Sequence, residues 1–328
     1  MVEMNYMIMG AGAWGTAMAI HLSKCSHRVV LVPRDEAKAN VIREHNENVF
    51  HLPGVKLPNT LVVDSHLEQH IEDNTVVFVA CPTQGLMDCC KKLEPFGTKI
   101  QHVISLVKGL DRNTLKTPSE LFRELLPQVR FACLSGPTYA LDFAKGKHAA
   151  MVLASESDVS LLQKAISNAF VRVYTSKDLK GVELGGCLKN IYAIGSGILE
   201  GLQLGDNARA AYLTRALKEL SVLGMYLGGR RETFFGLSGL GDLIATAQGI
   251  WSRNRSFGYA FASGQTVESL LQEKTVEGYW SIQCFYKLCS DVLDKAPILM
   301  ALHKILYQAA PLKDTIDALM LRSLKQEF

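Results

Sequence analysis

Several features are scarce or missing in this sequence, and each absence excludes a class of protein. The apolar runs all fall short of the roughly 18 residues that a membrane-spanning helix needs, so no membrane insertion is expected. The formal net charge of the 328 residues is only +3, which argues against a nucleic-acid or membrane-surface partner. The eight cysteines include no C-x-x-C pair, so we expect no metal site and free thiols in a reducing, cytoplasmic compartment.

The composition that remains is that of a folded protein with large cores. Hydrophobic residues make up 48% and charged residues 20% of the chain, which excludes a disordered or low-complexity protein. The length is about twice that of a typical domain of roughly 150 residues, so two domains are expected. A glycine-rich motif begins at Gly10 and leaves no room for a cleavable signal peptide before it, which again favours the cytoplasm.

The first half of the chain alternates short apolar runs with amphipathic stretches. Helices are predicted between several of the apolar runs, among them Trp14–Cys25 and Ser119–Leu126. Such alternation indicates a doubly wound (Rossmann), mostly parallel sheet with helices on both faces, over residues 1–178. The predicted strands are Tyr6–Met9, Arg28–Val32, Thr75–Ala80, His102–Val107, Arg130–Leu134, Ala149–Ala154 and Val171–Tyr174.

The second half has a different texture. Strand-like runs disappear, and apolar residues recur at helical spacing, so residues 179–328 are predicted to form an all-helical domain. Two abutting domains are expected to form a cleft, which is a common place for a ligand. The predicted helices begin with the apolar stretch from Gly181 to Ile198 and continue over Ala208–Leu227, Thr266–Glu273, Ser281–Leu293, Pro297–Leu306 and Leu312–Leu324.

A G-x-G-x-x-G motif lies between the first predicted strand and the first predicted helix. Gly10 would permit a tight turn, Gly12 would let the backbone approach a pyrophosphate, and Gly15 would let the helix pack closely on the strand. The helix N-terminus favours an anion. The alternative is a glycine turn that binds no ligand, but the strand–loop–helix–strand context favours a dinucleotide site.

The end of the second predicted strand bears on which dinucleotide is bound. Pro33, Arg34 and Asp35 follow this strand, where an NAD site usually carries an acidic residue for the adenosine ribose. Arg34 is well placed to pair with a 2′-phosphate, and Asp35 lies a residue or two late for the ribose. We therefore predict that NADPH is used at least as well as NADH, the alternative being that Arg34 is a solvated loop residue.

Polar and small residues follow the other predicted strands, at the edge where doubly wound sheets bind ligands. Lys108 follows the fourth predicted strand, and Ser135, Gly136 and Thr138 follow the fifth. The ammonium of Lys108 is a candidate to face the nicotinamide end of a dinucleotide. The alternative for Lys108 is a surface lysine whose stem covers apolar neighbours.

The helical half contains a lysine beside a glycine pair. Gly185 and Gly186 precede Lys189 by one turn, and glycine costs a helix roughly 1 kcal/mol relative to alanine. The pair suggests that another backbone or a ligand comes close there, with close helix packing beside an incidental lysine as the equal alternative. Asp242 follows a glycine-rich turn, where a helix N-cap is its simpler explanation.

Three other groups of residues are candidate ligand sites. The run from Ser252 to Arg255 supplies guanidinium donors that suit a phosphate, although a solvated basic loop is the alternative. His66 and His70 are one helical turn apart, but no third metal ligand is evident, so both are predicted to be surface-exposed. Cys89 and Cys90 are expected to pack on a helix.

Seven motifs follow one another along the chain: GAGAWGT from Gly10, Lys108-Gly109, Ser135-Gly136-Pro137, Gly185–Asn190, GLGD at 239–242, SRN at 252–254 and Glu277-Gly278. Together, in this order, they resemble the NAD(P)-dependent glycerol-3-phosphate dehydrogenases of the soluble, bacterial type. The resemblance runs from about residue 5 to about residue 325, and alanine before Trp14 favours the bacterial branch. Two residues depart from the pattern of this family: Thr138 stands where serine is common, and Pro33 is unusual at the end of the second predicted strand.

The resemblance implies reversible reduction of dihydroxyacetone phosphate to sn-glycerol 3-phosphate by NADPH or NADH without a metal, feeding glycerophospholipid synthesis. It implies Lys189, Lys108 and Asp242 as catalytic residues, with Lys189 as the acid/base, and a homodimeric assembly. The substrate would be surrounded by Lys108, Gly136, Thr138, Lys189, Asp242, Ser252, Arg253 and Asn254. The dinucleotide would contact Gly10, Gly12, Ala13, Trp14, Gly15, Arg34, Lys108, Ala140, Arg253, Thr275 and Glu277.

Two other readings fit parts of the sequence. Dehydrogenases of 3-hydroxy acids or of 6-phosphogluconate share the glycine loop and a helical domain with a catalytic lysine, but GLGD followed by SRN at this spacing is not expected of them. A non-catalytic dinucleotide-binding protein would keep the glycine loop and lose Lys189 or Asp242, and both are present.

Overall fold

The chain folds into two compact units. A computed structural model describes residues 4–25, 27–273, 275–324 and 326–327. The division lies inside the long helix α7 (Leu179–Gly201), with one unit over Met1–Glu183 and the other over Leu184–Phe328.

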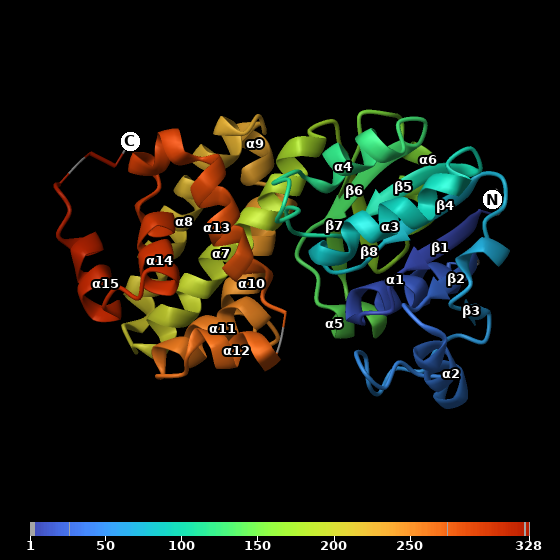
Figure 1. Ribbon diagram of the computed structural model, residues 1–328, viewed down its shortest axis with the longest axis horizontal. Helices are drawn as coiled ribbons and strands as arrows, with labels where there is room; N and C mark the ends of the chain where they lie inside the picture. The colour runs from blue at the N-terminus through green and yellow to red at the C-terminus, as the bar shows by residue number, and fades with distance from the viewer. Residues whose placement is uncertain (1–3, 26, 274, 325, 328) are drawn as a thin grey trace. The chain divides into compact units, whose positions relative to one another are not determined.

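The first unit is built on one eight-stranded sheet with the order β3-β2-β1-β4-β5-β6-β7-β8 (Figure 1). Every neighbouring pair is parallel except β6 and β7, which run antiparallel. The doubly wound, mostly parallel sheet is therefore confirmed. Its strands are β1 (Asn5–Met9), β2 (Arg28–Val32), β3 (Leu61–Val63), β4 (Thr75–Val79), β5 (Ile100–Ser105), β6 (Arg130–Ser135), β7 (Ala149–Ala154) and β8 (Val171–Ser176).

Helices cover both faces of this sheet, because alternate strand residues bury apolar side chains on opposite sides. On one face, Ile8 and Leu31 pack with Ile20 of α1 (Ala13–Lys24) and Ile42 of α2 (Glu36–His45). The same face is covered by α5 (Ala140–Ala144) and α6 (Ser160–Ile166). On the other face, Met7, Val77 and Val103 pack against α3 (Leu86–Leu93) and α4 (Pro118–Leu125).

The strand order reverses beside β1. The chain runs from β1 through β2 to β3 on one side, and then returns to β4 on the other side of β1. Ligands of doubly wound sheets bind at this switch point, outside the carboxyl ends of the strands. The loop after β1 is the glycine-rich loop, so the topology places it at the switch point.

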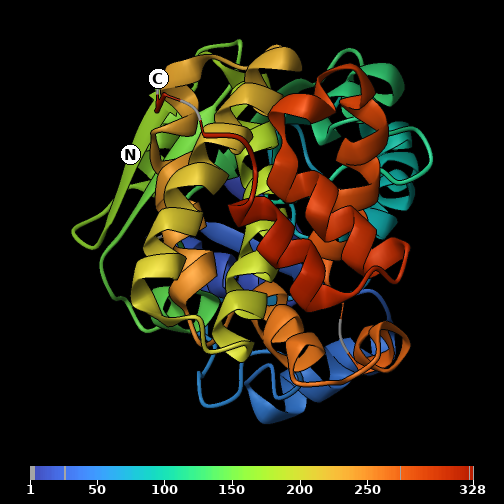
Figure 2. The ribbon, with the colours of Figure 1, turned by 90° about the vertical axis from the view of Figure 1, so that its left-hand side faces the viewer.

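The second unit consists of helices and loops over its described residues (Figures 1 and 2). Helix α7 is buried from residue 181 to residue 198, which its nearly continuous apolar sequence explains. No helix among the described residues has both the length and the apolar character needed to cross a membrane. The other helices are α8 (Gly205–Tyr226), α9 (Arg231–Phe234), α10 (Asp242–Gln248), α11 (Arg253–Ala262), α12 (Val267–Glu273), α13 (Glu277–Leu288), α14 (Pro297–Tyr307) and α15 (Leu312–Met320).

Several predicted boundaries were wrong. The fourth predicted strand, His102–Val107, forms instead over Ile100–Ser105, because Leu106 and Val107 continue the buried chain beyond the last paired residues. The predicted helix over Ser281–Leu293 begins at Glu277 and ends at Leu288, followed by a 3-10 segment over Ser290–Lys295. The last helix ends at Met320 rather than Leu324.

Candidate functional site

The glycine loop after β1 has the backbone geometry that a dinucleotide site requires. Gly10 has φ +109°, and a Cβ there would lie 2.9 Å from the Ala80 backbone. A Cβ on Gly15 would lie 2.0 Å from the Gly10 carbonyl oxygen. A Cβ on Gly12 would have no atom of the described residues within 4 Å, so the space beside this residue is open. Gly12 precedes α1 and provides no side-chain cap, which leaves the first N–H groups of the helix for an anion.

Asn48 supports this loop and was not found from the sequence. Its side chain is fully buried and its Nδ2 donates to the Ala11 carbonyl at 2.9 Å and to Thr16 Oγ1 at 2.7 Å. The bonds connect the loop before α1 with the loop after α2. No local pattern marks Asn48, because its partners lie 32 and 37 residues earlier in the chain.

Arg34 and Asp35 have different environments at the end of β2. Asp35 is the N-cap of α2, and its Oδ1 accepts the Lys38 N–H at 2.9 Å. The Arg34 side chain is 82% exposed, with its Nε 3.6 Å from Asp35 Oδ2. One Asp35 oxygen is thus committed to the helix, while the Arg34 guanidinium is accessible to a ligand.

Lys108, Gly136 and Thr138 lie together where β5 and β6 end. Lys108 Nζ donates to the Gly136 carbonyl at 3.0 Å, and Thr138 Oγ1 donates to the same oxygen at 3.3 Å. Gly136 has φ +143°, and a Cβ there would lie 3.0 Å from the Ala150 carbonyl oxygen. The structure thus brings these three predicted residues into one cluster, whose contact with a ligand stays a prediction.

The second unit contains a buried cation that is held by two side chains. Lys189 of α7 donates to Asp242 Oδ1 at 3.0 Å and to Thr246 Oγ1 at 2.6 Å. All three residues are at least nine-tenths buried, and Thr246 Oγ1 lies 3.2 Å from Asp242 Oδ1. A buried ion pair loses hydration, and the added hydroxyl contact compensates part of that loss. The arrangement fixes the position of the Lys189 ammonium.

Asp242 and Thr246 lie one turn apart on α10. Asp242 is the first residue of this helix rather than its N-cap, which is Gly241, so the N-cap explanation was wrong. Its carboxylate faces Lys189 instead. The i, i+4 spacing of Asp242 and Thr246 places both on one helix face. That spacing is the signal by which Thr246 was detectable once Asp242 had been chosen.

The close approach expected at the glycine pair is made by a backbone. A Cβ on Gly185 would lie 3.0 Å from the Ser238 carbonyl oxygen, so α7 and the segment Leu237–Gly241 touch at this point. The contact is four residues before Lys189 on α7. It brings the start of α10, and with it Asp242, next to Lys189.

The run from Ser252 to Arg255 divides into four roles. Ser252 is the N-cap of α11, and its Oγ accepts the Arg255 N–H at 3.2 Å. Arg255 pairs with Glu200 through its Nε at 2.7 Å, so it is committed inside the protein. Asn254 donates to Asn190 Oδ1 at 2.8 Å and accepts from the Gly278 N–H at 2.9 Å. Arg253, by contrast, is exposed.

The remaining predicted cofactor residues lie on two sets of elements. Ala13 and Trp14 begin α1, and the Trp14 ring lies 4.9 Å from that of Phe143 in α5, the helix that Ala140 begins. In the second unit, Thr275 lies in the loop before α13 and Glu277 is the first residue of that helix. Their contact with a cofactor stays a prediction.

Two buried carboxylates have raised pKa values but cap helices. Burial raises the pKa of Glu183 to about 7, although its Oε1 accepts the Ser119 N–H of α4 at 2.8 Å. Burial raises the pKa of Glu219 to about 8, although it accepts from the backbone N–H groups of Ile298 and Leu299 at the start of α14. Both groups satisfy helix N-termini, so their shifted pKa values do not mark them as catalytic.

The cysteines match the sequence prediction. All eight are free thiols, and five of them are buried. Burial raises the pKa of Cys90 to about 12, which makes its thiolate scarce and the residue unreactive.

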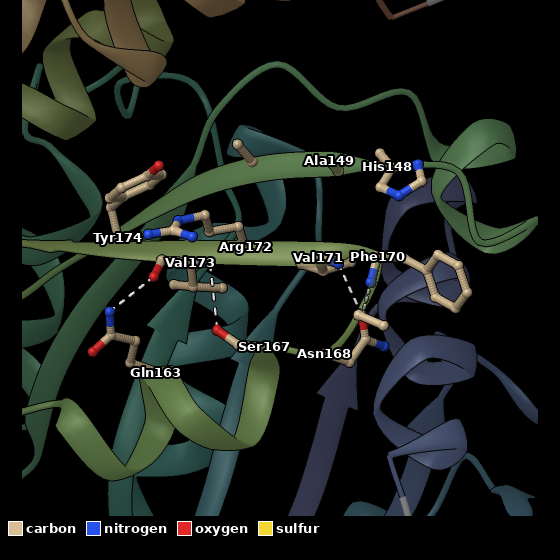
Figure 3. A pocket seen from close by; sticks show the side chains of 12 residues that line it. His148, Ala149, Gln163, Ser167, Asn168, Phe170, Val171, Arg172, Val173 and Tyr174 are labelled. Carbon is tan, nitrogen blue, oxygen red and sulfur yellow. Dashed lines mark hydrogen bonds between the residues drawn. The ribbon is translucent and has the colours of Figure 1, made fainter.

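A cavity of about 800 Å³ lies along the edge strand β8, away from the glycine loop on β1 (Figure 3). Phe170 and Tyr174 beside it are about half exposed, and the Arg172 guanidinium lies 5.1 Å from the centre of the Tyr174 ring. The lining contains none of the predicted site residues. We therefore assign the cavity no part in the chemistry.

The chain matches two family models, one in each half. The model described as the N-terminus of NAD-dependent glycerol-3-phosphate dehydrogenase matches residues 5–160, and the one described as its C-terminus matches residues 178–317. These two models together cover most of the chain.

Relatives that match over their full length are named after the same enzyme as the two family models. A protein of Carboxydothermus hydrogenoformans named glycerol-3-phosphate dehydrogenase (NAD(P)+) is 39% identical, covering 100% of this chain and 99% of the relative. A namesake from Francisella tularensis subsp. novicida is 36% identical, covering 99% and 100%. The crystal structure of glycerol-3-phosphate dehydrogenase from Coxiella burnetii superimposes with a TM-score of 0.88 at 31% identity, covering 98% of this chain and 99% of that one.

Proposed function

Because the chain belongs to the NAD-dependent glycerol-3-phosphate dehydrogenase family, we propose that it reduces dihydroxyacetone phosphate reversibly to sn-glycerol 3-phosphate with NADPH or NADH. The product is the backbone precursor of glycerophospholipids. The observation that carries the proposal is the buried Lys189 ammonium held by Asp242 and Thr246. The test is NADPH and NADH oxidation by the purified protein with dihydroxyacetone phosphate, with unphosphorylated dihydroxyacetone as control; no oxidation above the control would reject the proposal.

We propose different roles for the two halves of the chain. Residues 1–178 would bind the dinucleotide, with Gly12 next to its pyrophosphate and with Gly10 and Gly15 shaping the loop. Residues 179–328 supply the acid/base and the phosphate-binding groups. The uncapped N-terminus of α1 and the open space beside Gly12 fit an anionic cofactor in the first unit.

Lys189 is proposed as the acid that protonates the product oxygen. Bound NADPH or NADH supplies a hydride to the ketone carbon, so negative charge develops on the ketone oxygen. The Lys189 ammonium stabilises this charge and donates a proton to it. Asp242 and Thr246 hold Nζ in place and stabilise its charged form, and Lys108 is proposed as a second cation at the substrate.

Arg253 is proposed to bind the substrate phosphate. It is exposed at the first position of α11, whereas the Arg255 guanidinium beside it is paired with Glu200. Ser252 and Asn254 fix the turn that carries Arg253, through the N-cap and the bonds to Asn190 and Gly278. A guanidinium suits a phosphate because it donates two parallel hydrogen bonds.

Arg253→Ala is expected to raise KM for dihydroxyacetone phosphate by roughly tenfold to a hundredfold, because a charge-assisted hydrogen bond is worth about 1.5–3 kcal/mol. Steady-state kinetics with varied substrate measure it. Arg215→Ala, which removes an exposed arginine of α8, is the matched control and should leave KM unchanged. An unaltered KM in Arg253→Ala would remove this residue from the phosphate site.

Arg34→Ala is expected to weaken NADPH roughly tenfold and to leave NADH nearly unchanged, because only NADPH carries the 2′-phosphate. The measurement is kcat/KM for both dinucleotides. Arg123→Ala, on the exposed side of α4, is the control. If the ratio of the two cofactors stays the same in Arg34→Ala, the residue does not contact the 2′-phosphate.

We also propose a cytoplasmic location and a homodimer, without nucleic-acid or membrane partners. The eight free thiols support the cytoplasmic location. The net charge of +3 argues against nucleic-acid and membrane partners. The dimer follows from the family resemblance alone.

A further inference from the structure

Two neighbouring strands of the sheet end in side chains that are common metal ligands. Glu36 is the first residue of α2, after β2, and Asp64, His66 and His70 follow β3. The strands are parallel, and the Asp64 N–H donates to the Leu31 carbonyl at 3.1 Å. The fold therefore brings together residues that are about 30 positions apart in sequence. It adds two carboxylates to the histidine pair, for which the sequence showed no third metal ligand.

Three donor atoms of this cluster converge on one point. Asp64 Oδ1 lies 3.0 Å and Glu36 Oε2 lies 3.9 Å from His66 Nδ1. Each of the three residues offers one ligand atom, and these atoms lie within 4.8 Å of one another. Ligand atoms about 2.1 Å from a tetrahedral zinc ion lie roughly 3.4 Å apart. The observed separations bracket that value, so small side-chain rotations suffice to place an ion between them.

Other contacts hold the carboxylates in position. His70 Nε2 lies 2.8 Å from Asp64 Oδ2, the oxygen that does not face His66. Asp64 Oδ1 also accepts the His66 backbone N–H at 3.0 Å. Ser65 Oγ donates to Glu36 Oε2 at 2.6 Å, and Arg43 pairs with the opposite oxygen, Oε1. Such outer contacts orient metal ligands and are typical of built sites.

The charge and exposure of the cluster also suit a cation. Two carboxylates face two imidazoles, and Arg43 offsets one negative charge. The His66 side chain is 51% exposed and that of Asp64 is 21% exposed. An ion can therefore enter from solvent, and water can complete its coordination.

We propose that Glu36, Asp64 and His66 bind one divalent transition-metal ion of the zinc class, with His70 as a positioning residue that holds Asp64. The imidazole ligand favours zinc, cobalt or nickel over magnesium or calcium, which prefer ligand sets made of oxygen alone. None of the four residues belongs to the groups proposed for the reaction. The ion therefore has no role in hydride or proton transfer.

The test is a titration of the chelator-treated, reduced full-length protein with Co²⁺, followed by visible absorption at mildly alkaline pH, because metal ligands bind in their deprotonated form. One equivalent is expected to bind with the d–d bands of nitrogen and oxygen ligands, and Zn²⁺ should displace it. His66→Ala and Asp64→Asn should weaken binding at least tenfold. His70→Ala should weaken it roughly tenfold, as outer-shell changes commonly do.

Glu68→Gln is the matched control, because this exposed acid lies between His66 and His70 outside the proposed ligand set and should leave binding unchanged. Thermal unfolding of each variant without metal shows whether it is folded. The proposal fails if wild type binds no Co²⁺, if His66→Ala binds as tightly as wild type, or if a thiolate-to-cobalt charge-transfer band shows cysteine ligation. Chelator-treated protein should keep its turnover, so the metal site can fail without affecting the proposed function.

Discussion

Replacing Lys189 with alanine is expected to reduce kcat by roughly 10²- to 10⁴-fold, the range that general acid–base catalysis contributes. NADPH binding should persist, because the glycine loop lies in the other unit of the chain. The reason is geometric as well as chemical: Asp242 and Thr246 fix the ammonium at 3.0 and 2.6 Å. A solvent molecule in its place would have neither the fixed position nor the positive charge. The measurement is single-turnover NADPH oxidation beside fluorescence titration of NADPH.

The Lys189 experiment needs two further variants. Removing the lysine alone takes away the cation that is paired with the buried Asp242 carboxylate, which can cost about 3–5 kcal/mol of stability. The double variant Lys189→Met/Asp242→Asn removes both charges and should fold while remaining inactive. Lys180→Ala, on the same helix and paired with Glu120 in the first unit, should keep its turnover. Near-normal turnover in folded Lys189→Ala would show that another group supplies the proton.

Gly12→Ala is expected to leave the free protein folded and to weaken both dinucleotides by roughly a hundredfold, or about 2.7 kcal/mol. Gly12 has φ −75° and ψ 178°, which any residue adopts, and the added Cβ would meet no described atom within 4 Å. The methyl group would instead occupy space that the pyrophosphate needs. Thermal unfolding and fluorescence titration measure the two effects separately.

Gly15→Ala is the contrasting variant. Its Cβ would lie 2.0 Å from the Gly10 carbonyl oxygen, so this change should destabilise the free protein itself. The pair thus separates a glycine needed by the fold from a glycine needed by the ligand. Wild-type cofactor affinity in Gly12→Ala would mean that the pyrophosphate does not lie against this residue.

The sheet was predictable because its central strands are apolar runs bounded by turn residues. β2 and β7 begin and end where the sequence predicts. β3 was missed because it has only three residues, of which Val62 is exposed. Such a strand is too short for an alternation of apolar and polar residues to be recognised in the sequence. Its three residues are ordered by pairing with β2, a contact about 30 positions away in the chain.

The candidate site was predictable where a motif carries its own geometry and not where partners are distant. The glycine loop is local, so its turn followed from sequence. The partner of Lys189 is 53 residues away, and Thr246 and Asn48 have no motif of their own. Arg253 and Arg255 cannot be told apart in the sequence. In the structure Arg255 forms an ion pair with Glu200, whereas Arg253 is exposed.

Transfer of an isotopically labelled hydride tests the proposed reaction most directly. Wild-type protein is incubated with dihydroxyacetone phosphate and NADPH that carries deuterium at the transferred position of the nicotinamide C4, and the product is analysed by mass spectrometry and NMR. We expect sn-glycerol 3-phosphate with one deuterium on carbon 2, in equal amount to the NADPH oxidised. Absence of this product, or product without deuterium on carbon 2, would contradict the proposed reaction.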